Sequence, residues 1–169
     1  MFAVLAVGLL AGCQTAIPPE ALKLSQESLQ LRQLQSRRFD TAEESKLLVA
    51  SSNLLQDLGF TLEESDTKVG VLVGSKDRDA TESGQVAGAI MMAVLFGANM
   101  PVDTNQKIRA SLVTRPNGPN QTTVRVTFQR TVWNNHNQIS KIEGLVEPKM
   151  YQEFFDKLSQ SVFLTANSI

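Results

Sequence analysis

Two segments near the middle of the chain alternate apolar and polar residues, and this pattern constrains the fold more than any other feature. The apolar positions are Ile108, Ala110 and Leu112 in the first segment and Val124, Val126 and Phe128 in the second. Successive side chains of a β-strand point to opposite sides, so each segment is predicted to be a strand with one apolar face. The turn residues PNGPN at 116–120 reverse the chain between them, and the second strand runs on to Trp133. The sequence therefore predicts two neighbouring strands of an antiparallel sheet.

The positions between these apolar residues are polar and partly basic. They are Lys107, Arg109, Arg115 and Arg125, with Thr123, Thr127, Gln129 and Thr131 beside them. Antiparallel sheets commonly bury one face and leave the other in water, which is one interpretation of this basic strand face. The other interpretation is a surface that binds an acidic partner or a glycan.

Two helices are predicted on either side of the strands. The residues from Thr41 to Glu44 have the form of a capping box, leucines recur at helical spacing after them, and Gly59 follows as a C-terminal cap, which predicts a helix over 42–58. Pro148 suits the first turn of a final helix. Its buried stripe is predicted to be Tyr151, Phe154, Phe155, Leu158 and Val162. We expect Phe155 of this stripe to face Phe128 of the sheet.

The remaining strands are shorter. Phe60 and Leu62 begin a predicted strand, the turn at 64–68 follows, and the alternating valines at 69–73 form its partner. A short strand is also expected near 139–142, and residues 29–39 could form an edge strand or a short helix. The predicted fold class is α+β, with an antiparallel sheet of about four to five strands packed against two main helices and an inserted apolar helix. We expect a single domain over 29–169 that carries the apolar insertion at 81–101.

The chain has one cysteine, Cys13, which follows an uncharged apolar run at 2–11. That run has the length of a signal-peptide core and is too short to span a bilayer. The sequence from Leu10 to Cys13, LAGC, resembles the lipobox of bacterial lipoproteins. The resemblance implies a signal peptide at 1–12, a cysteine that carries diacylglycerol and an acylated amino terminus, and a tether at 13–28. The alternative is an ordinary small residue at the end of a membrane anchor.

The resemblance also implies a location. In enteric lipoproteins an Asp after the lipidated cysteine favours retention in the inner membrane, and this chain has Gln14 there. We therefore expect a lipid anchor in the outer membrane, with the domain facing the periplasm. In that setting Arg37 and Arg38 could face lipid head groups, although two such charges are more often simple solvated surface.

A second resemblance concerns the domain itself. The stretch LLQDLGFTLEESDTKVGVLVGS at 54–75 is similar to the helix–Gly–strand–turn–strand unit of Gram-negative periplasmic lipoproteins, and the helix-grip domains of BamC, a lipoprotein of the outer-membrane β-barrel assembly machine, have a similar plan. This resemblance implies a module that binds partners and catalyses nothing. The interruption at 81–100 departs from the BamC pattern.

That interruption, with the sequence SGQVAGAIMMAVLFGANMPVD at 83–103, holds no charge between Val86 and Ala98. It is too short for a transmembrane helix and too apolar for an exposed one. The residues expected to contact a partner, a second copy or the membrane are Gly84, Gly88, Met91, Met92, Ala93, Leu95, Phe96 and Gly97. The alternative is a crossover helix buried against the sheet.

Composition and motifs narrow the function. Sixteen basic and seventeen acidic residues leave a net charge of −1, which is not typical of a nucleic-acid-binding protein. The only histidine, His136, lies between asparagines in a predicted turn, and no metal site, cofactor site or catalytic set is predicted. We expect a non-catalytic binding or assembly accessory of the cell envelope, which contacts the membrane through its lipid and a protein partner or itself through residues 84–100. The alternatives are a structural component of an outer-membrane secretion or export machine and, less favoured, an envelope enzyme.

Overall fold

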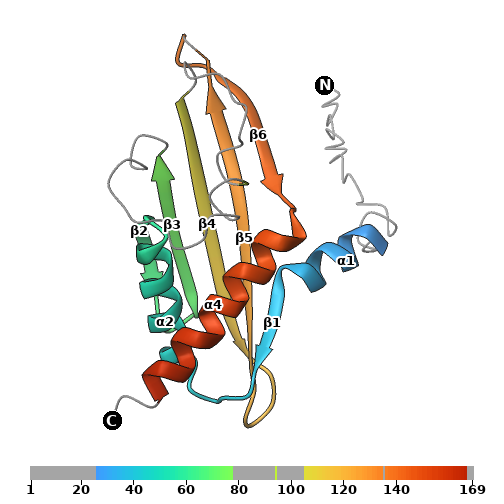
Figure 1. Ribbon diagram of the computed structural model, residues 1–169, viewed down its shortest axis with the longest axis vertical. Coiled ribbons are helices and arrows are strands. Elements are labelled where there is room, and N and C mark those ends of the chain that lie inside the picture. The colour runs from blue at the N-terminus through green and yellow to red at the C-terminus, as the bar shows by residue number, and fades with distance from the viewer. Residues whose placement is uncertain (1–25, 78–93, 95–104, 135, 167–169) are drawn as a thin grey trace, which may run out of the picture.

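The computed structural model describes residues 26–77, 94, 105–134 and 136–166. Its helices are α1 (Gln26–Leu34), α2 (Glu44–Asp57) and α4 (Pro148–Ala166). Its strands are β1 (Ser36–Phe39), β2 (Thr61–Asp66), β3 (Val71–Asp77), β4 (Asn105–Pro116), β5 (Thr122–Trp133) and β6 (Ile139–Leu145). Figure 1 shows α2 and α4 lying on the same side of the sheet, in front of it. The two layers confirm the predicted α+β class.

The sheet has six strands, all paired antiparallel, in the order β1-β5-β4-β3-β2, with β6 also paired to β5. Along one edge of β5, β1 pairs with residues 122–125 and β6 pairs with residues 128–133. Between them the backbone N–H of Val126 donates to the carbonyl of Gln35 at 2.9 Å. Two short strands and one turn residue therefore complete the edge of β5.

The prediction of about four to five strands was too low, because two short strands extend the edge of β5. Residues 29–39, predicted as either an edge strand or a short helix, contain the end of α1 and all of β1. The strand expected near 139–142 continues to Leu145. Both strands are held by pairing to a distant part of the chain, and local alternation carries little information about such pairing.

The predicted capping box at Thr41 to Glu44 was wrong. The residue that caps α2 is Glu43, which makes no side-chain capping hydrogen bond. The hydroxyl of Thr41 accepts a hydrogen bond from the N–H of Glu43 at 3.1 Å, so it forms a local turn before the helix. The carboxylate of Glu44 instead accepts the hydroxyl hydrogen bond of Thr114 on β4. A contact between helix and sheet has replaced the local one.

The C-terminal end of α2 was predicted correctly. Gly59 has φ of +80°, its N–H donates to the carbonyl of Gln56, and the N–H of Phe60 donates to the carbonyl of Leu55. This pair of hydrogen bonds is the Schellman arrangement, which satisfies carbonyls that the helix itself leaves free. It turns the chain directly into β2.

The core lies between the two helices and the face of the sheet that they cover. From α4 it receives Tyr151, Phe154, Phe155 and Leu158, each at most 2 % exposed, as predicted. The ring of Phe128 on β5 lies 5.7 Å from the rings of both Tyr151 and Phe154 and 6.2 Å from that of Phe60. Phe155 packs against Phe154 instead, so the expected contact between Phe128 and Phe155 was wrong by one position on the helix.

The signal peptide, Cys13 and the candidate contact residues at 84–97 lie outside the described residues. Of the apolar segment the structure describes Val94, which is partly buried and packs against the core cluster. The insertion and the tether up to residue 25 therefore stay predictions, and residues 26–28 of the predicted tether begin α1.

Candidate functional site: the basic face of the sheet

The face of β4 and β5 that α2 and α4 do not cover carries the basic residues predicted from the sequence. The register sets Lys107 opposite Thr131, Arg109 opposite Gln129, Ser111 opposite Thr127, Val113 opposite Arg125 and Arg115 opposite Thr123. All of these residues lie at positions between the buried ones. The predicted basic strand face is thus confirmed, and we call it the basic face.

At one end of the basic face the cations are paired with carboxylates. Arg109 lies 3.2 Å from Glu63 on β2, and Lys107 lies 3.8 Å from Asp77 on β3. The register of β2 and β3 shifts between Leu62 and Glu64. Glu63, the extra residue at this bulge, also accepts a hydrogen bond of 2.6 Å from the hydroxyl of Ser75. We call this region the paired end.

At the other end, near the turn between β4 and β5, the arginines surround a hollow of about 580 Å³. Arg115 comes from β4, Arg125 from β5 and Arg32 from α1. Within the described part of the chain, none of these three guanidinium groups is paired with a carboxylate. Ser36, Val113, Pro116, Asn117, Gly118 and Thr123 complete its lining. We call this region the arginine hollow.

Arg125 is held in place from one side. Its Nη2 donates to the side-chain oxygen of Gln35 at 2.9 Å. Gln35 is itself buried, and its backbone carbonyl accepts the N–H of Val126 and so continues the edge pairing of β5. The Nε of Arg125 is buried and has no hydrogen-bond partner among the residues described. A buried N–H without an acceptor is costly, so the position of this guanidinium is held by its other contacts.

The surroundings of the arginine hollow add further donors. Ser36 on β1 and Thr123 on β5 supply hydroxyl groups, and Asn117 supplies an amide. Gly118 has φ of +85°, and a Cβ built there would meet no atom within 4 Å, so the turn leaves space above the hollow. A smaller hollow of about 400 Å³ adjoins it, shares Ser36, Asn117 and Thr123, and includes Arg38. The arrangement is suited to binding an anion.

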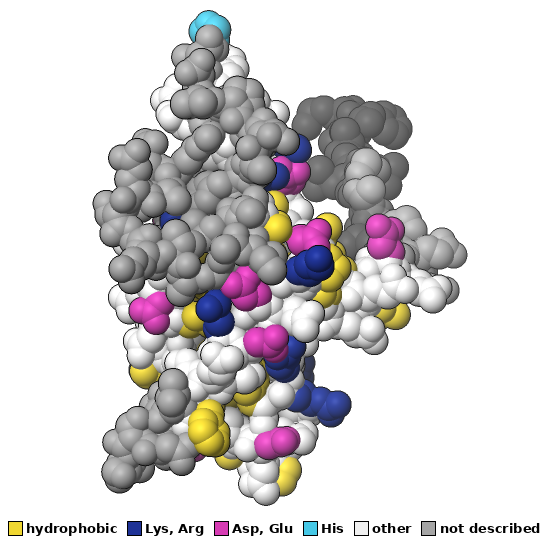
Figure 2. Space-filling view, in the orientation of Figure 1, with side chains coloured by type: hydrophobic (Ala, Val, Ile, Leu, Met, Phe, Trp, Pro, Cys, Tyr) yellow, Lys and Arg dark blue, Asp and Glu magenta, His cyan; other side chains and the backbone are white. Residues whose placement is uncertain are grey.

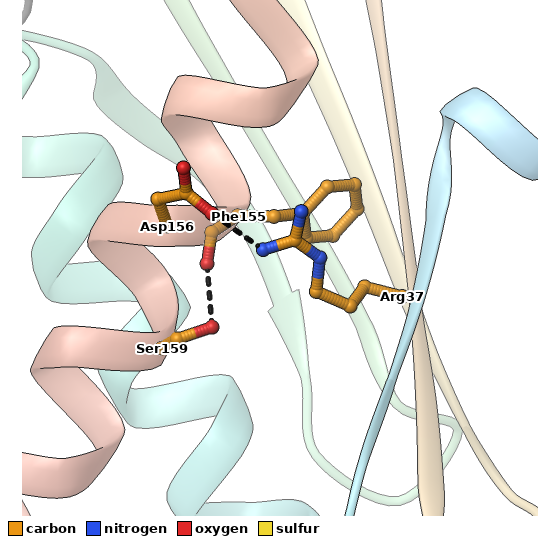
Figure 3. Close-up of polar contacts among 4 residues, drawn as sticks. All are labelled: Arg37, Phe155, Asp156 and Ser159. Atoms are coloured by element: carbon orange, nitrogen blue, oxygen red, sulfur yellow. Dashed lines mark hydrogen bonds and ion pairs between the residues drawn. The ribbon is translucent and has the colours of Figure 1, made fainter.

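The neighbouring arginines Arg37 and Arg38 have different surroundings, because successive residues of β1 point to opposite faces. Figure 3 shows Arg37 reaching α4, where its guanidinium donates to Asp156 at 2.8 Å and lies 5.1 Å from the centre of the Phe155 ring. Arg38 pairs in register with Thr123 and is exposed. The two arginines therefore lie on opposite faces of the sheet, and a contact with lipid head groups stays a prediction.

The helix-covered side differs in charge from the basic face. Figure 2 shows acidic and basic side chains interspersed there. Glu143 on β6 receives hydrogen bonds from Lys141 and Arg130, which hold its pKa below the ordinary value of 4.5. Burial raises the pKa of Tyr151, whose hydroxyl donates to the carbonyl of Leu145 at 2.8 Å. These contacts fasten β6 and α4 to the sheet.

The described residues were compared with the requirements of a metal site and of a membrane-spanning helix. There, no three His, Cys, Asp or Glu side chains are grouped so that they could hold a metal ion. His136 is exposed in the turn before β6, where its backbone N–H donates to the side-chain oxygen of Asn134. None of the described helices combines the length and apolar composition that crossing a membrane requires.

Comparison with protein-family models and with curated proteins found no match. The site rests on its geometry alone. Of the residues around the arginine hollow, the sequence pattern predicted Arg115, Arg125 and Thr123. It missed Arg32 and Ser36, because only the pairing of β1 with β5 brings them there.

Proposed function

We propose that this protein is a lipid-anchored, non-catalytic binding module of the bacterial cell envelope, and that it binds its partner through the basic face. The observation that supports this proposal most is the difference between the two faces of the sheet. One face is covered by α2 and α4, and the other presents exposed Val113 and Arg115. A cationic surface attracts acidic groups and raises their local concentration.

Anchoring at Cys13 is proposed from the resemblance of residues 10–13 to a lipobox. Lipidated chains need more than one acyl group for stable anchoring, and a diacylglycerol with an amide-linked acyl chain satisfies that requirement. Cys13→Ser is expected to abolish labelling by radioactive palmitate and leave the precursor unprocessed. Equal labelling of the variant and the natural chain would exclude a lipid anchor at this position. We also propose that the anchor lies in the outer membrane, with the domain in the periplasm.

The binding proposal is tested by site-specific photo-crosslinking in cells. A photo-reactive amino acid at Thr127, on the basic face, is expected to capture a partner. The matched control is Val49, which is 55 % exposed on α2 and lies on the opposite side of the sheet. Equal adducts from both positions, or none from Thr127, would contradict recognition through the basic face.

The same experiment addresses the predicted contact through residues 84–100. Crosslinks from Met92 to a subunit that co-purifies in fixed proportion would favour the alternative role, a structural component of a secretion or export machine. We place this role second, because its candidate contact residues lie outside the described part of the chain.

A further inference from the structure

The arginine hollow narrows the class of ligand that the basic face would recognise. Its three arginines come from three different elements, α1, β4 and β5, and line one space. Like charges that lie close together repel each other, and a carboxylate from the same chain normally offsets them, as Glu63 does for Arg109. Among the residues described, Arg32, Arg115 and Arg125 have no such carboxylate. An external anion would supply this counter-charge.

The number of donors favours one anion chemistry. A single arginine fork already satisfies the two oxygens of a carboxylate, whereas three guanidinium groups offer donors to more oxygens than a carboxylate has. A terminal phosphate group has three free oxygens and a charge of about −1.5 to −2 at neutral pH. The hydroxyls of Ser36 and Thr123 add donors at the same place.

We propose that the arginine hollow is a binding site for a phosphate group, held by Arg32, Arg115 and Arg125. This inference rests on the proposed function, because it names the ligand chemistry of the same face. Arg125 is the fixed member, since Gln35 orients it from behind. Arg32 and Arg115 are exposed and close on the anion from its outer side. The phosphate can be free in solution or can belong to a lipid head group, and both present the same terminal oxygens to the site.

The test uses the full chain in a nonionic detergent and isothermal titration calorimetry with two probes. One probe is inorganic phosphate and the other is dihexanoyl phosphatidate, a short-chain lipid with a terminal phosphate. Arg115→Gln and Arg32→Gln are each expected to weaken binding roughly tenfold or more, because each removes charge-assisted hydrogen bonds. Arg115→Lys keeps the charge but loses the planar fork, and should recover only part of the affinity.

The matched control is Arg109→Gln. It makes the same charge change on the same strand and the same face, but at the paired end, so it should leave the affinity for both probes within about twofold. Binding of both probes indicates that the phosphate group alone is recognised, and binding of phosphatidate alone indicates a lipid head group; either result supports the site if Arg115→Gln removes it. Because Arg32 and Arg115 are exposed, these variants should unfold at a temperature close to that of the natural chain.

Three results would overturn the inference. They are no binding of either probe at millimolar concentration, equal losses in Arg109→Gln and Arg115→Gln, and binding of a glutamate-rich peptide without binding of phosphate. The last of these would leave the proposed function intact, because an acidic partner would still use the basic face. Failure of the proposed function itself would be seen separately, as the absence of crosslinks from Thr127.

Discussion

The two ends of the basic face have similar side chains and opposite electrostatic conditions. At the paired end, Arg109 and Lys107 are met by Glu63 and Asp77 from the neighbouring strands. At the arginine hollow, Arg115 belongs to the same strand as these two cations, and no described carboxylate pairs with it. The difference arises from the elements that lie beside each end of β4 and β5. β2 and β3 bring acids to one end, whereas α1 and β1 bring Arg32 and Arg38 to the other.

The basic face thus combines a region with a structural role and a region with the capacity to bind. Exposed ion pairs contribute little to stability, so the paired end mainly neutralises charge and fixes the orientation of its side chains. The exposed arginines of the hollow, Arg32 and Arg115, gain no attraction from a described carboxylate and retain their capacity for an external anion. The covered face of the same strands supplies the stability that both ends depend on.

The largest expected effect is the loss of stability caused by a change on the covered face. Phe128→Ala removes the ring at the centre of the contacts with Phe60, Tyr151 and Phe154, and is expected to lower the free energy of unfolding by about 3–5 kcal/mol. Its control is Thr127→Ala, one residue away on the basic face, with an expected change below about 0.5 kcal/mol. Urea unfolding followed by circular dichroism measures both. Similar losses in the two variants would mean that the faces are not divided in this way.

The second prediction concerns the adjacent arginines of β1. Arg37→Gln removes the ring contact with Phe155 and the ion pair with Asp156, which together should cost about 1 kcal/mol. Arg38→Gln removes a side chain on the basic face and should leave the free energy of unfolding within about 0.5 kcal/mol of the natural value. If Arg38→Gln is the more destabilising change in urea unfolding, the assignment of the two side chains to opposite faces is wrong.

The third prediction compares the two ends directly. Arg109→Gln should lower the free energy of unfolding by less than about 1 kcal/mol, because it breaks an exposed pair with Glu63. Arg115→Gln should raise it slightly, by less than about 0.5 kcal/mol, because it relieves repulsion from the other arginines of the hollow. High salt should reduce both differences by screening. A loss of stability in Arg115→Gln equal to that in Arg109→Gln would show that Arg115 has a partner.

The smallest effect depends on pH. Hydrogen bonds from Lys141 and Arg130 lower the pKa of Glu143 below 4.5 in the folded state. A carboxyl group with a lowered folded pKa contributes stability above its unfolded pKa, and this contribution is lost as the pH falls through the folded pKa. Stability should therefore decline below about pH 4.5, and Glu143→Gln should reduce that decline. Chemical unfolding at neutral and acid pH measures it, and an unchanged acid dependence in the variant would remove Glu143 as a cause.

The parts of the fold that local sequence determines were predicted, and those that depend on distant pairing were not. Gly59 ends α2 as expected, because its hydrogen bonds stay within five residues. The long alternation in β4 and β5 predicted both strands and the face that carries Arg115 and Arg125. The sequence does not decide between strand and helix for β1, because its four residues are held in place by β5, far along the chain.

The candidate site also has a part that local sequence predicts and a part that depends on distant residues. The alternating pattern placed the cations of β4 and β5 on one face but could not tell which of them would be neutralised. Neutralisation of Arg109 depends on the bulge that puts Glu63 beside it, and the hollow depends on Arg32 of α1. The capping box failed for a related reason, since Glu44 found a partner on β4. Ion pairs between separate elements have no periodic signal in the sequence.

The bond between Gln35 and Arg125 joins residues 90 positions apart. A chain synthesised from its N-terminus leaves β1 unpaired until β5 has emerged, and closing so long a loop costs entropy before any contact repays it. The β2–β3 and β4–β5 hairpins close over short turns and can form earlier. The arginine hollow is therefore among the last features to be assembled, and an anion bound there favours the completed chain over every intermediate that lacks β1.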